Sequence, residues 1–313
     1  MPCLRLKKRD NQEKTIKELF DEFLLNLKSN QRSRWTIKTY TEKINSFLRY
    51  VPSGTLCKDI TQKTIENYMQ ELLKTNRETS VNTHLTHLKT IFNYATEKGY
   101  MKQIKINKIS AQEKQKRVYS KEDLEELLRE EPRESFMRYQ ARIIIATFVS
   151  TGLRLSELIS LQVRDIDFNN LIIYSRHTKT KKNRLLPIST SLKVLLIEWL
   201  TYRKYENEED TLFCNSYAKP LNTNTLQTLI RRYCIHKKVG DKSIHQFRRT
   251  FITHAVNKNV DIISLSRITG HTNLKTLNKY YVNDAERVAS LADRVSILES
   301  IDLCINRKRR IRK

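Results

Sequence analysis

Apolar residues recur at helical spacing along the first hundred positions of the chain. Between residues 14 and 28 they form one stripe, made of Ile16, Leu19, Phe20, Phe23, Leu24 and Leu27. Because such a stripe lies along one side of an α-helix, it predicts an amphipathic helix that packs on a core. Similar spacing predicts helices at about 33–50, 61–73 and 79–98, the last ending near Gly99. Together the four helices predict a small bundle.

The helical pattern is lost between Lys102 and Val118. This stretch is polar and basic and has no regular apolar spacing, which is typical of a connection between domains. It also lacks glycine and proline, and both an extended path and a freely flexible one remain open. We therefore predict an N-terminal helical domain at residues 1–102 and a linker at 103–118.

Helical spacing returns after the linker. Ser120 is followed by Asp123 and then by leucines at helical spacing, as expected at the start of a helix. The apolar run at 143–149, which contains only Thr147 as a polar residue, predicts a buried helix that ends at Gly152. Further helices are predicted at about 190–206, 222–238, 243–257 and 261–269, with Gly270 ending the last of them.

Three segments near the middle of the chain are β-prone and too short for helices. They lie at about 164–168, 171–175 and 184–188. The predicted fold is therefore mainly α with a small antiparallel β-sheet, in which an α+β domain at 119–293 follows the helical bundle. An apolar stripe predicts one more helix at 284–305, so that residues 294–313 hold the end of that helix and a basic tail.

The charge of the chain predicts a polyanionic partner. Lysine and arginine number 59 against 34 acidic residues, which gives a formal net charge of +25. The excess is shared: residues 1–118 carry net +12 and the remainder net +13. Because a well-solvated surface rarely needs so much charge of one sign, nucleic acid is the expected partner of both halves.

Cysteine usage and hydropathy predict a cytoplasmic protein with no membrane segment. With nucleic acid as partner it is expected to be nucleoid-associated, and no cofactor is expected. The five cysteines are scattered and form no CxxC pair, which is typical of reduced thiols. Cys234 and His236 lack the spacing of a zinc site. The start of the chain is basic but has no apolar signal core, and no long uncharged apolar run follows.

Four short motifs in the second half of the chain carry the residue types of a phosphodiester-cutting site. They are TGLRLSEL at 151–158, TKTKKNRLLP at 178–187, HQFRRTFITH at 245–254 and ITGHTNLKTLNKYY at 268–281. An enzyme that opens a DNA backbone without water needs a nucleophile, cations that hold a phosphorane, and an acid for the departing oxygen. Tyrosine, arginine, histidine and lysine can supply these functions.

In this order the motifs resemble those of the tyrosine recombinase family, also called the phage integrase family, and its Xer-like two-domain members in particular. The resemblance identifies Arg154 and Arg248 as the arginines that clamp the scissile phosphate. It identifies His245 and His271 as histidines that bind this phosphate and assist proton movement, and Glu157 as a supporting acid. Any one of these motifs alone is also typical of an ordinary helix, and the prediction depends on their joint occurrence in order.

The same resemblance identifies Lys179 as the general acid and Tyr280 as the nucleophile. Both residues have neighbours of their own type. Lys181 and Lys182 compete with Lys179, and the whole stretch also fits a solvated basic loop. Tyr281 is the neighbour of Tyr280, although the spacing from the glycine–histidine pair of the last motif favours Tyr280.

The resemblance implies a site-specific DNA recombinase that cleaves and rejoins strands through a 3′-phosphotyrosyl intermediate without ATP or metal. It implies double-stranded DNA as partner and a homo-tetramer on two DNA sites, or a hetero-tetramer with a related recombinase. The N-terminal domain is expected to bind one side of the DNA as a core-binding domain. Candidate contacts, which fit solvated surface charge equally well, are Arg32, Arg34, Lys38, Arg77 and Lys89.

Other functions remain open from the sequence alone. Within the family, integration or excision of a mobile element competes with the resolution of DNA multimers. A type IB topoisomerase uses similar residue types but swivels one duplex, so it would relax supercoils whatever their sequence. A catalytically silent DNA-binding regulator would keep the basic domains and lose the chemistry, and the complete set of motifs argues against it.

Overall fold

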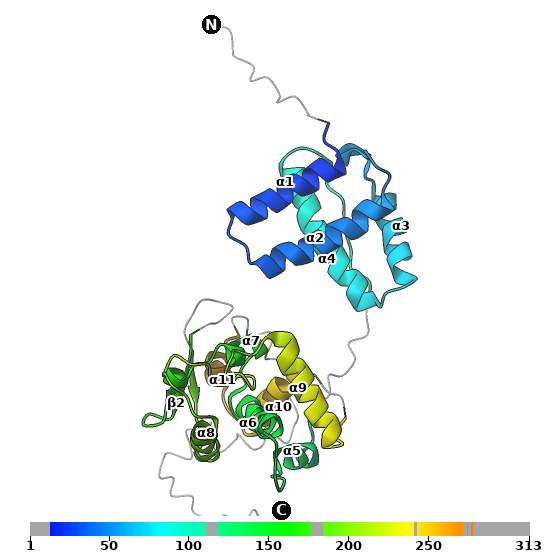
Figure 1. The fold of residues 1–313 in the computed structure, drawn as a ribbon. Helices are drawn as coiled ribbons and strands as arrows, with labels where there is room; N and C mark the ends of the chain where they lie inside the picture. The colour runs from blue at the N-terminus through cyan, green and yellow to red at the C-terminus, as the bar shows by residue number, and fades with distance from the viewer. Residues whose placement is uncertain are drawn as a thin grey trace, which may run out of the picture. The chain divides into compact units, whose positions relative to one another are not determined.

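The computed structural model describes residues 13–110, 118–176, 184–240 and 243–271, together with Leu274 and Leu277. The chain forms two compact units, Met1–Lys114 and Gln115–Lys313 (Figure 1). Helices dominate both units, and the second also holds a three-stranded antiparallel sheet. The predicted fold class is therefore confirmed. Within the described residues no helix is long and apolar enough to cross a membrane.

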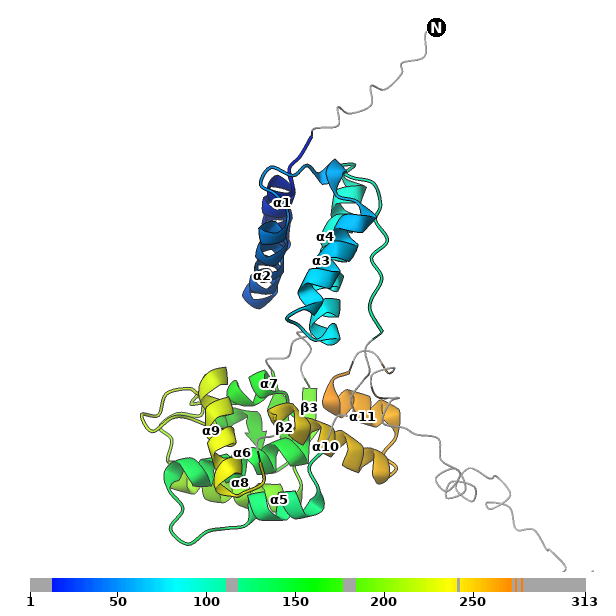
Figure 2. The same ribbon diagram turned by 90° about the vertical axis from the view of Figure 1, so that its right-hand side faces the viewer.

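The first unit is the predicted bundle of four helices, α1 (Ile16–Ser29), α2 (Arg34–Tyr50), α3 (Gln62–Leu73) and α4 (Glu78–Glu97). Helix α1 packs on α2, and α3 packs on α4 (Figure 2). The apolar stripe of α1 faces this core, where Leu19 and Phe20 are almost completely buried. Thr15 fixes the start of α1, because its hydroxyl accepts from the Glu18 N–H while the Glu18 carboxylate accepts from the Thr15 N–H.

The start of the predicted linker differs from expectation, because residues 103–110 pack against the first unit. Ile106 is buried in the helical core, and Ile104 and Ile109 pack beside it. The Asn82 side chain holds the end of the segment through two hydrogen bonds to the Ile109 backbone, at 2.8 Å to its nitrogen and 2.9 Å to its oxygen. Three isoleucines of this segment thus pack on the bundle. Residues 111–117 lie outside the described part of the chain.

The second unit is built around α6 (Phe136–Thr151), whose residues 140–148 are all buried. Four helices contact it: α5 (Lys121–Leu128), α8 (Thr190–Arg203), α9 (Thr223–His236) and α10 (Ile244–Asn257) (Figure 2). Helix α11 (Ile262–Thr269) packs on α10 and on the sheet. These positions confirm the predicted helices, including the start of α5 at Ser120, whose hydroxyl accepts from the Asp123 N–H.

The sheet consists of β1 (Ile166–Asp167), β2 (Ile172–Ser175) and β3 (Arg184–Pro187), in that order. Strand β2 pairs with both neighbours, and Ile173 lies opposite Ile166 on one side and Leu186 on the other. The predicted strand at 164–168 is too long. Val163–Asp165 forms a short 3-10 helix instead, because the buried Asp165 carboxylate accepts a hydrogen bond from the Gln162 N–H.

Helices α6 and α11 both end at a glycine in the left-handed conformation. Gly152 has a φ of 63° and Gly270 a φ of 66°, values that residues with a side chain adopt only with strain. Both helix ends were predicted from these glycines. The sequence did not indicate α7 (Leu155–Ile159), a single turn that starts three residues after Gly152. The helix predicted at 284–305 and the basic tail lie outside the described residues.

Candidate active site

Three arginines from three elements converge on the turn that ends α11. Arg154, just before α7, donates from Nη2 to the carbonyl oxygen of Gly270 at 2.9 Å. Arg184, the first residue of β3, donates from Nη1 to the carbonyl oxygen of Thr269 at 2.7 Å. Arg248, on α10, donates from Nη2 to the same Thr269 carbonyl. Segments that lie up to 116 residues from the turn in the sequence therefore meet at two consecutive peptide units.

The turn can be approached so closely because residue 270 is glycine. A Cβ atom there would lie 2.4 Å from Nη1 of Arg184 and 3.4 Å from Nη1 of Arg154. The positive φ of Gly270 also favours glycine. Both the backbone conformation and the space that the guanidinium groups occupy thus require glycine at position 270.

Glu157 connects two of the arginines through its carboxylate. Its carboxylate is buried and accepts from Nη1 of Arg154 at 2.8 Å, from the Arg154 backbone N–H at 2.7 Å and from Nη2 of Arg184 at 2.6 Å. Burial alone would raise the pKa of Glu157, but the charge of Arg184 and the hydrogen bonds from Arg154 outweigh it and hold the pKa below its usual range. Glu157 is therefore ionised at neutral pH.

Arg248 also joins the ends of two helices. Its guanidinium is buried, and Nη1 donates to the carbonyl oxygen of Gly152 at the end of α6 while Nη2 donates at the end of α11. Because carbonyls at the last turn of a helix lack partners within that helix, a guanidinium satisfies them well. The apolar packing of α6 and α10 thereby fixes the direction in which Arg248 points.

His271 follows the turn and lies in the field of these arginines. Its Nδ1 lies 2.7 Å from the Thr269 hydroxyl, and its carbonyl oxygen accepts from the Ser266 hydroxyl at 2.6 Å. Burial, followed by the charges of Arg248, Arg154 and Arg184, lowers the pKa of His271 to about 4. The ring is therefore neutral near pH 7 in the unbound protein.

His245 is in the first turn of α10, three residues before Arg248. Although the residue as a whole is exposed, the surroundings of its ring are partly desolvated. That desolvation lowers the pKa of His245, and the positive charges of Arg249, Arg248 and Arg154 add to the effect. The charges of Arg248 and Arg154 thus lower the pKa of both His245 and His271.

Five of the seven predicted site residues are described, namely Arg154, Glu157, His245, Arg248 and His271, and they belong to one electrostatic cluster. The other two, Lys179 and Tyr280, lie outside the described residues, as do Lys181, Lys182 and Tyr281.

Arg184 is a member of the cluster that sequence reasoning missed. The sequence pattern predicts for Arg184 only that it begins a β-prone segment. The alternating pattern of the strand could have indicated its burial, because Arg184 and Leu186 are two residues apart on β3 and both are buried. An arginine on the buried side of a strand requires a carboxylate or carbonyl partner nearby.

The candidate DNA contacts of the first unit are all exposed. Arg32 lies in the loop before α2, Arg34 and Lys38 lie on α2, and Arg77 and Lys89 lie at the start and in the middle of α4. Their exposure leaves them accessible to a partner, but solvated surface charge has the same exposure. Their role remains a prediction.

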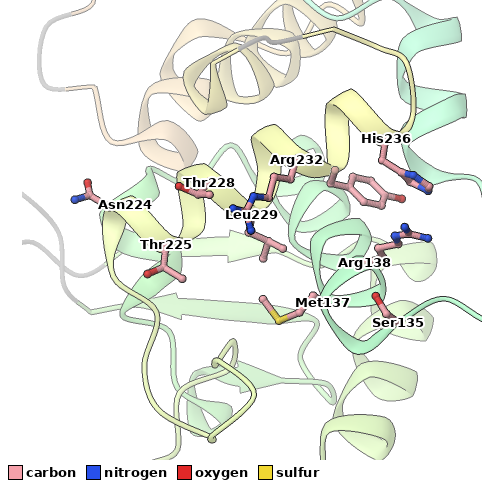
Figure 3. Close-up of a pocket in the computed structure, with 10 residues that line it drawn as sticks. Ser135, Met137, Arg138, Asn224, Thr225, Thr228, Leu229, Arg232 and His236 are labelled. Atoms are coloured by element: carbon pink, nitrogen blue, oxygen red, sulfur yellow. The ribbon is translucent and has the colours of Figure 1, made fainter.

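A cavity of about 580 Å³ is separate from the arginine cluster. It lies between the start of α6 and the length of α9 (Figure 3). Its lining mixes apolar and basic side chains and includes Met137, Arg138, Leu229, Arg232 and His236. None of the five described site residues lines it. Within the described residues, no group of three or more histidine, cysteine or acidic side chains is placed to hold a metal ion.

Two family models match the chain. The phage integrase family matches residues 116–287, and the phage integrase N-terminal SAM-like domain matches residues 20–99. Among curated proteins, a tyrosine recombinase of Thermosipho africanus is 26% identical and aligns over 86% of this chain and 96% of its own length. Tyrosine recombinase XerA of Pyrococcus furiosus is also 26% identical, over 92% of this chain and 98% of its own.

Solved structures share the fold at lower sequence identity. The Tn1549 transposon integrase in complex with a circular intermediate DNA has a TM-score of 0.76 at 17% identity, covering 90% of this chain and 99% of that one. The XerH site-specific recombinase bound to a palindromic difH substrate has a TM-score of 0.68 at 22% identity, covering 94% and 90%.

The catalytic-family match spans more than half of the chain and contains all four motifs within its limits. The fold of the second unit and the arginine cluster around residues 269–271 lie inside the same match. The chain therefore belongs to the phage integrase family, the tyrosine recombinases, which are enzymes that cleave and rejoin DNA.

Proposed function

We propose that this protein is a site-specific DNA recombinase in which Arg154 and Arg248 hold the scissile phosphate. The observation that carries the proposal is the convergence of these two arginines on the Thr269–Gly270 turn, directly beside His271. Guanidinium groups held by main-chain carbonyls are already oriented when substrate arrives, so little reorganisation accompanies charge development in the transition state. The low pKa of His271 reflects burial first and then the positive field of the arginines, which a phosphate would neutralise.

In the proposed reaction, the hydroxyl oxygen of Tyr280 attacks phosphorus and displaces the 5′-oxygen, which Lys179 protonates. A 3′-phosphotyrosyl link forms with the energy of the broken bond conserved. The 5′-hydroxyl of a partner strand then attacks this link and releases the tyrosine, so the sequence of steps needs neither ATP nor a metal. His245 and His271 hydrogen-bond the phosphate, and Glu157 orients Arg154. The roles of Lys179 and Tyr280 depend on the family resemblance.

The proposed substrate is double-stranded DNA, bound by both units. A net charge of +25 shared by both halves supports this assignment. Relatives of similar fold were solved with DNA, among them the Tn1549 transposon integrase with a circular intermediate and a lambda integrase dimer with a core site. We propose a tetramer on two duplexes as the working state, which acts in integration and excision of a mobile element or in resolution of DNA multimers.

Trapping of the covalent adduct tests the proposal. Nicked duplexes tiled across the DNA that flanks the gene would be incubated with wild type, Tyr280→Phe and Tyr281→Phe, and resolved on a denaturing gel. We expect an adduct with wild type and Tyr281→Phe but none with Tyr280→Phe. Loss only in Tyr281→Phe would move the nucleophile by one residue. Sequence-specific binding without any adduct would favour the silent regulator.

The acid can be tested on the same gel. A duplex with a 5′-thiol leaving group needs no protonation, because a thiolate is a far better leaving group than an alkoxide. Lys179→Ala is expected to form adduct slowly on the ordinary duplex and at the wild-type rate on the thiol-containing one. Lys181→Ala and Lys182→Ala are the matched controls, and rescue of either of them instead would reassign the acid.

A further inference from the structure

The cluster contains one buried arginine to which the proposed mechanism gives no role. Arg184 is 7% exposed, and its two terminal nitrogens donate to Thr269 and to Glu157. It stands at the first described position after the segment that holds Lys179. Burying a guanidinium is unfavourable unless its partners compensate, so its position between a carboxylate and a helix end needs an explanation.

The two oxygens of Glu157 are divided between two cations. Oε1 accepts from Nη1 of Arg154 at 2.8 Å, and Oε2 accepts from Nη2 of Arg184 at 2.6 Å. If Arg184 were absent, the full negative charge of Glu157 would act on Arg154 alone. Arg154 would then attract a phosphate less strongly, because its nearest neighbour would already neutralise it.

A count of formal charges shows the size of the effect. In the unbound protein Arg154, Arg184 and Arg248 contribute three positive charges and Glu157 one negative charge, while His271 is neutral. The cluster therefore carries net +2. Attack of a tyrosine oxyanion on a phosphodiester builds up two negative charges on the phosphorane, which a more positive cluster stabilises more strongly. Without Arg184 the cluster would carry only +1.

We infer that Arg184 is a positioning residue that neutralises Glu157 and thereby leaves the charge of Arg154 available to the reacting phosphate. This inference rests on the proposed function of the cluster. Arg184 acts through Glu157 and through the Thr269 carbonyl that it shares with Arg248. Gly270 is part of the same arrangement, because only glycine leaves room for the Arg184 guanidinium.

Charge substitutions test the inference. The variants are Arg184→Gln, Glu157→Gln and the double variant, which would carry net +1, +3 and +2. The substrate is the duplex that wild type cleaves. Two quantities are measured for each variant: the rate of adduct formation under single-turnover conditions and the affinity for this duplex. We expect Arg184→Gln to slow adduct formation by at least about tenfold with a much smaller loss of affinity, and the double variant to be faster than Arg184→Gln.

A matched pair separates charge from folding. Arg142 is likewise a buried arginine of the second unit, 5% exposed, and it binds Glu134 and Glu130 away from the cluster. Arg142→Gln and the double variant Glu134→Gln with Arg142→Gln are expected to change thermal stability but not the rate of adduct formation per folded molecule.

The phosphate itself gives a second readout that does not depend on the folded fraction. A methylphosphonate at the scissile position removes one negative charge from the transition state. The ratio of adduct rates on the methylphosphonate and the ordinary duplex is taken within one protein preparation, so the folded fraction cancels. We expect this ratio to be higher for Arg184→Gln than for wild type and unchanged for Arg142→Gln.

The outcomes distinguish this inference from the proposed function. Absence of any adduct with wild type would overturn the proposed function itself. An adduct with wild type, together with an unchanged methylphosphonate ratio for Arg184→Gln or a double variant no faster than Arg184→Gln, would overturn the inference and leave Arg184 as a structural residue. Arg184→Lys, which keeps the charge but not the planar fork, is expected to fall between wild type and Arg184→Gln.

Discussion

The Nδ1 atom of His271 lies 2.7 Å from the hydroxyl oxygen of Thr269. That hydroxyl donates its single proton to the carbonyl oxygen of Leu265, 2.6 Å away, so it can only accept from His271. The imidazole proton is therefore on Nδ1, and Nε2 carries the lone pair. In the unbound protein His271 thus offers an acceptor, whereas hydrogen bonding to a phosphate oxygen requires a donor.

DNA binding is accordingly expected to make His271 take up a proton. A phosphate among Arg154, Arg184 and Arg248 offsets the positive charge that helps to hold the pKa near 4, so the pKa rises on binding. Calorimetry of DNA binding at about pH 6, in two buffers with different ionisation enthalpies, measures the uptake. His271→Gln should reduce it, and identical enthalpies in both buffers with wild type would contradict the prediction.

Gly270→Ala is expected to abolish adduct formation. The substitution strains a backbone with a φ of 66° and places a Cβ 2.4 Å from Arg184. Gly99→Ala is the control, because Gly99 has a similar φ of 79° but no atom within 4 Å of the added Cβ. Strain alone should cost each variant about 1–2 kcal/mol in urea unfolding. If Gly270→Ala formed adduct as fast as Gly99→Ala, the turn would not be needed to place the arginines.

Acid is expected to weaken the first unit through His84. Lys43 Nζ lies 3.0 Å from Nε2 of His84 and can only donate, so the ring is neutral. Burial, followed by the charge of Lys43, lowers the pKa of His84 to about 4. Because the unfolded chain has a histidine pKa of about 6.5, it binds more protons below that pH. The stabilisation is complete above about pH 6.5 and is lost as the pH falls toward 4.

Hydrogen exchange of peptides from α3 and α4, followed from pH 7 to 4 and corrected for intrinsic exchange rates, measures this loss. His84→Gln should flatten the pH dependence, since glutamine does not titrate. His87→Gln on the same helix is the control. If hydrogen exchange in His84→Gln depended on pH as steeply as in wild type, groups other than His84 would cause the acid sensitivity.

Asn82→Ala is expected to release residues 103–110 from the first unit. The substitution removes two hydrogen bonds to the Ile109 backbone, each worth about 1 kcal/mol. Limited trypsin digestion should then cleave faster after Lys105 and Lys108. Asn93→Ala, at an exposed position of the same helix, should not change the cleavage rate. Equal protection in both variants would mean that the isoleucine contacts hold the segment without Asn82.

Much of the fold followed from periodic apolar residues and from two glycines. Ile143 to Phe148 form so continuous an apolar run that a buried helix was the natural reading, and α6 is that helix. Gly152 and Gly270 marked helix ends because left-handed termini favour glycine. These patterns depend on neighbouring residues only, so they can be recognised in the sequence without the tertiary structure.

The missed features depend on tertiary contacts. A helix as short as α7 has too few internal hydrogen bonds to be signalled by periodicity, and the structure holds it through Glu157, which reaches Arg184 on a strand far along the chain. Arg184 itself looked like one more cation in a basic stretch. Ile104, Ile106 and Ile109 follow neither the helical nor the strict strand period, so their packing on the bundle was not indicated.

The partners that orient the three arginines include the carbonyl oxygens of Gly152, Thr269 and Gly270. Every residue type has such an oxygen, so no point substitution can delete one; it can only move it. The backbone conformation at these three residues, more than the identity of their side chains, therefore sets the direction of the guanidinium groups. Positions 152 and 270 have no side chain that could be lost, but an added one would clash with Phe251 at position 152 and with Arg184 at position 270.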